Sequence, residues 1–260
     1  MKTKKNYLGI DIGGTKIRGV IVDDIKFPPL HKFLIKTPNN KRDFLKALER
    51  EIKKFEDKKS FNGIGVGLPG AIDFKRGIFI KAPNIHYLKN WPAKKFFLEF
   101  SKKVLLDNDS RCFLRAEKIL GAAKNFKNIA ALTIGTGIGG VLIINGKIYK
   151  GKNGTAGEFG YMITDNYKTL EQLGAKKAYL KSGDRSKIIG IGVANVINAF
   201  DPDAVVLGGG GVVNNKVKLS VVKKIARKFI MSPLSKKTPI IKSKIGEFSS
   251  AIGAALLFEK

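Results

Sequence analysis

Two stretches of this 260-residue chain repeat one pattern, in which an apolar run leads into a glycine-rich turn and a second apolar run leads out. The first stretch covers residues 7–23 (YLGIDIGGTKIRGVIVD) and the second covers residues 129–146 (IAALTIGTGIGGVLIING). When residues 12–15 (IGGT) are laid on residues 134–137 (IGTG), the flanking apolar residues also fall in register. Apolar runs on both sides of a short turn predict paired β-strands. The repeat therefore predicts two lobes built on one duplicated unit.

Elsewhere in the chain, β-type apolar runs alternate with amphipathic helical patterns, which is typical of an α/β protein. Further strands are predicted at residues 63–69, 104–109 and 203–211, and helices at residues 44–55, 93–103, 111–126, 189–200 and 249–258. Asp109 or Ser110 is the natural N-cap of the helix that follows the strand at 104–109. With 43% apolar residues, the chain can form the core of one large domain or of two lobes.

Two familiar nucleotide-binding motifs almost match this sequence. Gly135, Gly137 and Gly140 satisfy G-x-G-x-x-G, but a dinucleotide-binding loop must open a helix, and the residues that follow predict a strand. Residues 146–153 resemble a phosphate-binding loop until Asn153, which stands where a hydroxyl would bind magnesium. Neither motif is supported by its context.

The two glycine turns themselves are better candidates for anion binding, because such turns let backbone N–H groups point at a phosphate. Asp11, before the first turn, could hold a hydrated Mg²⁺, and Thr15 and Lys16 could contact phosphate oxygens. Either turn alone could also be purely structural, since tight turns need glycine. The two turns together with the run GGGG at residues 208–211 favour nucleotide binding.

The charge balance is unusual, because 49 Lys and Arg face 21 Asp and Glu and give a formal net charge of +28. Such a charge attracts polyanions. The basic residues are nevertheless dispersed along the chain, with no basic block interleaved with aromatic residues of the kind that binds RNA. A compositional bias with a solvated basic surface and a phosphate-rich ligand both remain open, and no specific nucleic acid is predicted.

No apolar stretch of the sequence approaches the roughly 20 residues of a membrane span, and no signal-peptide pattern follows the charged start. We therefore expect a cytoplasmic protein without a membrane partner. The single cysteine, Cys112, cannot form an internal disulfide and is expected to be a small core residue.

Seven segments of the sequence, in order and over nearly the whole chain, resemble the ROK family of sugar kinases, repressors and uncharacterised reading frames. They are DIGGTKIRG, GVGLPGAID with KAPNIHYLKNW, LLDNDSRCFLRAE, LTIGTGIGG, GEFGYM, DPDAVVLGGGG and SAIGAALLF. The resemblance implies a two-lobed actin-like ATPase (ribonuclease H-like) fold with a ligand cleft between the lobes. The small lobe would comprise residues 1–110 and 249–260, and the large lobe residues 111–248.

The resemblance also implies an ATP-dependent, glucokinase-like hexose kinase that uses Mg²⁺. By position, Asp109 would be the general base that takes the proton of the sugar hydroxyl. The sugar would be bound by Gly70, Asn84, Asn108, Glu158, Tyr161 and Glu171. ATP would be bound by Asp11, Gly13, Gly14, Thr15, Lys16, Gly135, Thr136, Gly137, Gly208, Gly209 and Gly210, with Asp11 holding Mg²⁺ through water. In isolation, an Asp at the start of a helix is more often only a cap.

Zinc-bearing relatives have a histidine where this chain has Tyr161, followed by a cysteine cluster that is absent here. A tetrahedral structural zinc needs nitrogen or sulfur ligands, and this chain has only His31, His86 and Cys112, away from that segment. No structural zinc is therefore expected. Glu158 and Glu171 remain as carboxylates that can accept hydrogen bonds from sugar hydroxyls.

Several alternatives remain open at the level of sequence. The phosphoryl donor could be polyphosphate in place of ATP, and the fold could serve a non-catalytic sugar- or nucleic-acid-binding protein. Family repressors carry an added N-terminal helix-turn-helix, and the first phosphate segment here begins by Tyr7, so no such device is expected. The sequence does not identify the hexose, and a homodimer is expected from the common form of the family.

Overall fold

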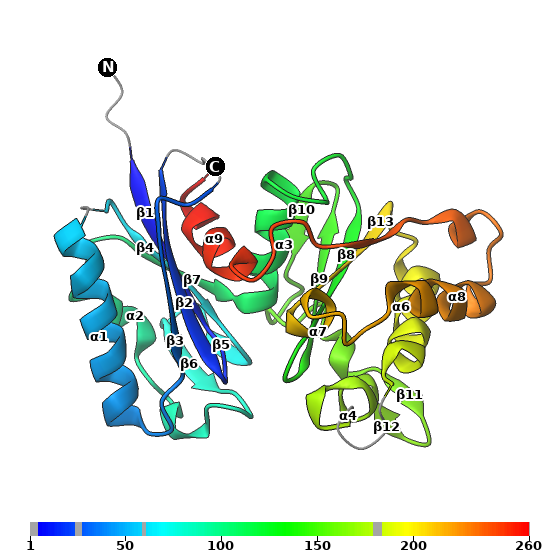
Figure 1. Cartoon of the computed structure of the whole chain (residues 1–260), viewed down its shortest axis with the longest axis horizontal. Coiled ribbons are helices and arrows are strands. Elements are labelled where there is room, and N and C mark those ends of the chain that lie inside the picture. The colour runs from blue at the N-terminus through cyan, green and yellow to red at the C-terminus, as the bar shows by residue number, and fades with distance from the viewer. Residues whose placement is uncertain (1–4, 24–27, 59–60, 179–183, 260) are drawn as a thin grey trace. The chain divides into compact units, whose positions relative to one another are not determined.

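The computed structural model describes residues 5–23, 28–58, 61–178 and 184–259. The chain divides into two compact units, one made of residues 1–116 and 248–260 and the other of residues 117–247. Each unit contains its own five-stranded sheet and its own hydrophobic core (Figure 1). Residues 1–4 and 260, which the predicted small lobe includes, lie outside the described residues.

The sheet of the first unit has the strand order β3-β2-β1-β4-β7. Its strands are β1 (Asn6–Ile12), β2 (Lys16–Asp23), β3 (His31–Lys36), β4 (Ile64–Leu68) and β7 (Val104–Asn108), and a separate hairpin is formed by β5 (Ala71–Asp73) and β6 (Ile78–Lys81). Strands β1, β2 and β3 form an antiparallel meander, whereas β4 and β7 run parallel to β1. The parallel strands bring their carboxyl ends to one edge of the sheet, where Asp11 and Asn108 lie.

The two faces of this sheet are covered by different helices (Figure 1). The helices of the unit are α1 (Lys41–Lys58), α2 (Ala93–Leu98), α3 (Asp109–Ile119) and α9 (Ser249–Ala255), with short 3₁₀ turns η1 (His86–Leu88) and η4 (Leu256–Phe258). On one face, Leu8 and Ile10 of β1 share a buried core with Phe44 and Leu48 of α1 and with Phe97 of α2. Alternation along a strand sends the neighbouring residues to the other face.

Helix α9 lies directly on the backbone of this second face. Gly9 and Gly65 are paired across β1 and β4. A Cβ added at Gly9 would meet Ala251 O at 2.0 Å, and one at Gly65 would meet Ala254 O at 1.8 Å. Only glycine allows so close an approach of helix to sheet.

The sheet of the second unit has the order β10-β9-β8-β13-β14, which repeats the pairing pattern of the first. Its strands are β8 (Ile129–Ile134), β9 (Ile138–Ile144), β10 (Lys147–Tyr149), β13 (Ala204–Gly208) and β14 (Ile240–Lys242). As in the first unit, three strands form an antiparallel meander and two run parallel to the first of them. The predicted duplicated unit is confirmed by this topology.

The predicted register between the two stretches is correct before the turn and wrong by one residue after it. Ile12 pairs with Ile17 in the first unit, whereas Ile134 pairs with Ile138 in the second. The first turn is therefore one residue longer, and turn length sets the register of a hairpin.

The second unit also contains several helices and a small hairpin. They are η2 (Phe159–Tyr161), β11 (Ile163–Asp165), β12 (Lys168–Thr169), α4 (Leu170–Gly174), α6 (Ser186–Phe200), α7 (Gly210–Val213), α8 (Leu219–Phe229) and η3 (Ser235–Lys237). Helices α6 and α8 pack side by side and share a core with β8 and β13 (Figure 1).

Several predicted elements are longer than those in the structure. The helix predicted over 93–103 ends at Leu98, where tight turns formed by Glu99 and Phe100 follow. The helix predicted over 111–126 begins at Asp109 and ends at Ile119, two residues before Gly121. The strand predicted over 203–211 ends at Gly208, and a short helix follows it. Cys112 is buried, as predicted.

Candidate functional site

The first glycine turn, residues 13–15, is held in place from outside the hairpin. Gly13 N donates to Lys16 O over 3.0 Å and closes the turn. Thr37, just after β3, donates its Oγ1 proton to Gly13 O over 2.6 Å and its backbone N–H to Thr15 O over 3.0 Å. Thr37 is not among the predicted site residues, because a lone threonine between a strand and a helix carries no local signal. The turn is thus braced as a defined loop with Thr15 and Lys16 exposed.

Asp11, the predicted Mg²⁺ residue, is a buried carboxylate at the end of β1. Burial raises its pKa from 3.8 to about 6, against the opposing effect of Arg18, which lies 3.3 Å away from its Oδ2. A single carboxylate fits Mg²⁺ bound through water, because this ion keeps several waters and takes only one or two carboxylates from a protein. A buried anion whose charge is costly is also a favourable place for a further cation.

The predicted sugar-side residues are brought to the first turn. A Cβ at Gly14 would meet Asn84 Cβ at 2.5 Å, so the exposed Asn84 lies against the turn. Gly70 has a φ of +69° and approaches Lys81 O, which a Cβ would meet at 2.5 Å. This approach joins the segment after β4 to the segment after β6, and so places Gly70 beside the residues that lead to Asn84.

Asn108, not Asp109 or Ser110, provides the main cap of α3, and the predicted cap is therefore wrong. Asn108 Oδ1 accepts hydrogen bonds from Ser110 N at 3.0 Å and from Arg111 N at 3.4 Å, the two N–H groups that an N-cap side chain satisfies. Asp109 is the first residue of α3, is half-buried, and accepts from Ser110 N at 2.7 Å. The purely capping interpretation of Asp109 is weakened, because its neighbour already caps the helix.

A buried ion-pair cluster, which was not predicted from the sequence, fixes the start of α3. Asp107, which is 1% exposed, lies 3.3 Å from Arg111 and 3.0 Å from Arg115. Asp107 Oδ1 also accepts from Asn108 N at 2.9 Å. The i, i+4 spacing of Asp107 and Arg111 was the available signal, but the strand-to-helix junction between them hid it. The cluster locks the backbone on which Asp109 is presented.

Gly67 completes this arrangement on β4. It pairs with Asp11 on one side and with Asp107 on the other. A Cβ at Gly67 would meet Cys112 Sγ at 3.4 Å and Asp109 Cα at 3.5 Å. The candidate base therefore starts its helix directly over the strand that separates Asp11 from Asp107.

The second glycine turn, residues 135–137, is closed by Gly135 N donating to Gly137 O over 2.9 Å. Glu171, a predicted sugar ligand on α4, also reaches this turn. Its Oε2 accepts from Ile138 N at 2.8 Å, and a Cβ at Gly137 would meet the same oxygen at 2.7 Å. One carboxylate therefore joins the predicted sugar segment to the predicted phosphate turn.

Glu158 and Tyr161 lie at the two ends of the short 3₁₀ turn η2, which buried Phe159 and Gly160 anchor to the sheet. A Cβ at Gly160 would meet Ile138 O at 2.2 Å. Tyr161 is 60% exposed, and its pKa is raised above 10 by partial burial and then by the charges of Glu171 and Glu158. The structure thus groups the three predicted sugar-binding side chains Glu158, Tyr161 and Glu171.

The predicted adenosine segment, residues 208–210, lies beside the second turn. Gly209 has a φ of +84°, and a Cβ there would meet both Ile134 N and Ile134 O at 2.7 Å. Gly208 pairs with Thr133 of β8. The glycine run thus contacts the strand end from which the second turn starts, and Thr136 lies within that turn.

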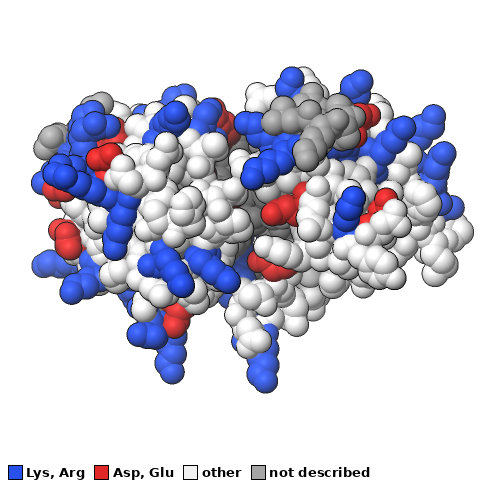
Figure 2. All heavy atoms as spheres, turned by 90° about the horizontal axis from the view of Figure 1, so that it is seen from below, with Lys and Arg blue, Asp and Glu red and all other residues white. Residues whose placement is uncertain are grey.

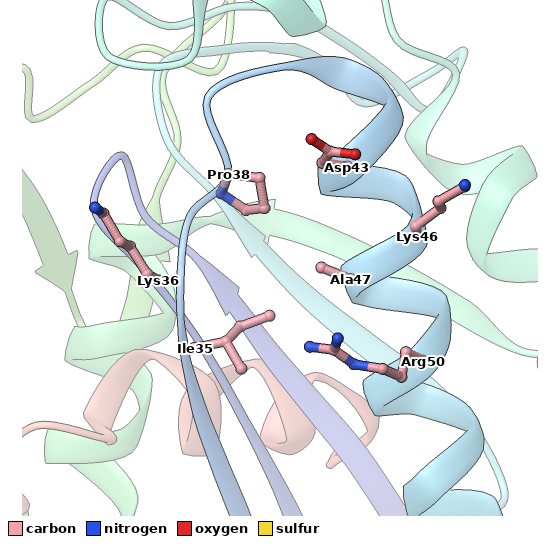
Figure 3. Close-up of a pocket in the computed structure, with 7 residues that line it drawn as sticks. All are labelled: Ile35, Lys36, Pro38, Asp43, Lys46, Ala47 and Arg50. Atoms are coloured by element: carbon pink, nitrogen blue, oxygen red, sulfur yellow. The ribbon is translucent and has the colours of Figure 1, made fainter.

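A hollow of about 520 Å³ lies elsewhere in the first unit, between β3 and α1. It is lined by Ile35, Lys36, Pro38, Asp43, Lys46, Ala47 and Arg50 (Figure 3). In the close-up, Lys36 and Lys46 point away from the space between strand and helix. Asn40 Nδ2 donates a hydrogen bond to Asp43 Oδ2 over 2.7 Å. We therefore propose no ligand for this hollow.

The basic residues form no single stripe on the face shown in Figure 2, where Lys and Arg side chains lie at many separate places. Within the part of the chain that the structure describes, no three His, Cys, Asp or Glu side chains are grouped so as to hold a metal ion. The described helices include none with the length and apolar character needed to cross a membrane.

Comparison with known proteins finds sugar kinases that are similar to this chain over nearly its whole length. N-acetyl-D-glucosamine kinase of Histophilus somni is 28% identical, with 97% of this chain and 98% of that protein aligned. Glucokinase of Thermotoga maritima is 25% identical, with 99% of this chain and 98% of that glucokinase aligned. The crystal structure of a ROK hexokinase from Thermus thermophilus matches with a TM-score of 0.79 and 27% identity, covering 96% of this chain and 97% of that one. This likeness confirms the actin-like α/β fold of the ROK sugar kinases. Because the profile of the ROK family matches residues 7–176 and 170–260, this chain belongs to the ROK family.

Proposed function

We propose that the protein is a sugar kinase that transfers the γ-phosphoryl group of ATP to a hydroxyl of a hexose, with glucose as the expected substrate. The observation that carries the proposal is the presentation of Asp109. Its helix is capped by Asn108 and its backbone is locked by the Asp107 cluster, so the carboxylate itself is not needed to start the helix. Family membership and the sugar kinases among the relatives support the same conclusion.

In this proposal Asp109 accepts the proton of the attacking sugar hydroxyl. Phosphoryl transfer depends on positioning and on charge stabilisation, and a carboxylate orients the hydroxyl in line with the phosphorus atom. Asn108 uses its Oδ1 for the helix cap and has its amide N–H groups to donate to sugar oxygens. Asn84, which lies against Gly14, binds the sugar close to the first turn.

The two glycine turns and residues 208–210 hold the nucleotide in the proposal. Backbone N–H groups of Gly14 and Thr136 donate to phosphate oxygens, and Lys16 adds a positive charge. Mg²⁺ held by Asp11 through water would neutralise charge on the phosphates. Glu158, Tyr161 and Glu171 hydrogen-bond to hydroxyls of the sugar.

Polyphosphate is the second candidate donor, and the net charge of +28 favours it, because a long polyanion gains affinity from counterion release. The glycine run at residues 208–211 against the second turn favours ATP. A non-catalytic ROK protein would bind a sugar without turnover.

We further propose a homodimer, which light scattering on the purified protein tests.

The deciding experiment measures phosphoryl transfer to glucose, mannose, fructose and N-acetylglucosamine, with MgATP and with polyphosphate as donors, at low and high salt. We expect turnover of glucose with MgATP. Turnover of N-acetylglucosamine alone would correct the substrate, and strong polyphosphate turnover with negligible ATP turnover would correct the donor. Sugar binding by calorimetry without turnover from either donor would refute the kinase. Asp109→Asn, compared in parallel, shows whether any turnover depends on the proposed base.

A further inference from the structure

Glu171 is hydrogen-bonded to the end of the second glycine turn. The carboxylate Oε2 accepts from Ile138 N at 2.8 Å, immediately after Gly137. A charged acceptor on a backbone N–H is among the stronger protein hydrogen bonds. The end of the turn is thus held by a side chain from a helix thirty-three residues further along the chain.

The helix that carries Glu171 is short but firmly set. Its N-cap is Thr169, which forms a reciprocal capping box with Gln172. Leu170 is fully buried, and its N–H donates to Met162 O at 2.8 Å, next to η2. The charge of Glu171 also acts on Tyr161 of η2. A displacement of Glu171 therefore reaches both the turn and the η2 group.

We propose that Glu171 is a positioning residue that couples the sugar site to the second phosphate turn, so that sugar binding orders residues 135–138 and each substrate tightens the binding of the other. The inference rests on the proposed function and adds to it a role for Glu171 beyond contact with sugar. A sugar hydroxyl that bonds to the carboxylate fixes its orientation and thereby strengthens its bond to Ile138 N. By linkage, nucleotide at the turn then favours the sugar by the same factor.

Substitution of glycines within the turn can test this coupling, because an added side chain at one of them would push Glu171 away. A Cβ at Gly137 would meet Glu171 Oε2 at 2.7 Å, whereas a Cβ at Gly135 has nothing within 4 Å. Neither glycine has a positive φ, so alanine fits the backbone at both positions. The atom in the way at Gly137 is the end of a flexible side chain, and Gly137→Ala therefore displaces the carboxylate while the fold is kept.

We expect Gly137→Ala to weaken glucose binding, measured by calorimetry without nucleotide, by about 5-fold or more. Gly135→Ala is the matched control in the same turn and leaves glucose affinity without nucleotide within about 2-fold of the wild type, since no side chain lies near it. Equal glucose affinities for the two variants would overturn the proposal.

The direct readout is hydrogen exchange of the amides of residues 134–140. In the wild type, saturating glucose is expected to slow their exchange, and Glu171→Ala to speed it and to abolish the effect of glucose. Glu158→Ala is the control, because it weakens sugar binding yet keeps the protection once glucose is saturating. Glu171→Gln keeps an acceptor and retains part of the protection, which covers the case in which Glu171→Ala does not fold. Glucose that binds the wild type without protecting this segment would overturn the inference.

Failure of the inference is distinguishable from failure of the proposed function. A non-hydrolysable ATP analogue should bind the wild type at least about 5-fold more tightly with glucose present than without it. The same ratio should fall towards one in Glu171→Ala but not in Glu158→Ala. An active kinase in which both variants keep the wild-type ratio refutes the coupling alone, whereas a protein without sugar turnover refutes the function.

Discussion

The roles of the neighbouring residues Asn108 and Asp109 can be separated by a substitution that removes one function at each position. Asp109→Asn keeps the shape of the side chain and an oxygen that accepts from Ser110 N, but it removes the base. Asn108→Ala removes the oxygen that accepts from Ser110 N at 3.0 Å and from Arg111 N at 3.4 Å, but it leaves the base. Asn108→Asp keeps the cap, because Asp and Asn cap helices equally well.

The expected magnitudes differ in kind. Loss of general base catalysis lowers kcat by about 10²- to 10⁴-fold, which is about 3 to 5 kcal/mol of activation free energy, so Asp109→Asn should lose that much turnover. Its melting temperature should stay within about 1 °C of the wild type. Loss of an N-cap costs about 1 kcal/mol of folding free energy, so Asn108→Ala should lower the melting temperature by roughly 2 to 4 °C.

The assay is steady-state kinetics with MgATP and the best sugar, combined with thermal unfolding of the three variants and with sugar affinity by calorimetry. Asn108→Ala should weaken sugar binding, while Asn108→Asp separates the lost amide from the retained cap. Undiminished turnover of Asp109→Asn would refute the assignment of Asp109 as the base. An unchanged melting temperature of Asn108→Ala would refute the assignment of Asn108 as the cap of α3.

Three further predictions follow from other parts of the structure. Glu158→Gln and Glu171→Gln should each weaken sugar binding more than they lower kcat, because each removes a charge-assisted hydrogen bond worth about 1.5 to 3 kcal/mol. Calorimetry measures the sugar affinity and steady-state kinetics measure kcat. A loss of kcat with unchanged sugar affinity would contradict this prediction. Burial raises the pKa of Asp11 from 3.8 to about 6, so in metal-free buffer its protonation stabilises the folded state. This contribution to the free energy of unfolding is about 3 kcal/mol, is complete below about pH 4 and is lost as the pH rises through 6. Denaturant unfolding should show the loss in the wild type and not in Asp11→Asn. A zinc-selective chelator should leave folding and activity unchanged when Mg²⁺ is in excess, and stoichiometric zinc in the purified protein would disprove this.

The sequence by itself determined the fold class, the duplicated units and the family. These properties are encoded locally: alternation along the strands, helical spacing of residues such as Phe44 and Leu48, and glycines at the two turns are visible without knowing what packs against them. It also placed Asp109 at the start of a helix and the predicted phosphate ligands at the two glycine turns. Its errors within elements were errors of length, as in the helix predicted beyond Ile119.

Only the tertiary structure decided which partner each polar side chain takes. Arg18 pairs with Asp11 across the β1–β2 hairpin, and Glu171 holds Ile138 N from α4. The one-residue difference between the two turns was likewise invisible, because it depends on how β2 and β9 pair with their neighbours. The physical reason is that a hydrogen bond or an ion pair requires two atoms within about 3 Å, and residues distant in sequence reach that distance only after the sheet and its helices have packed.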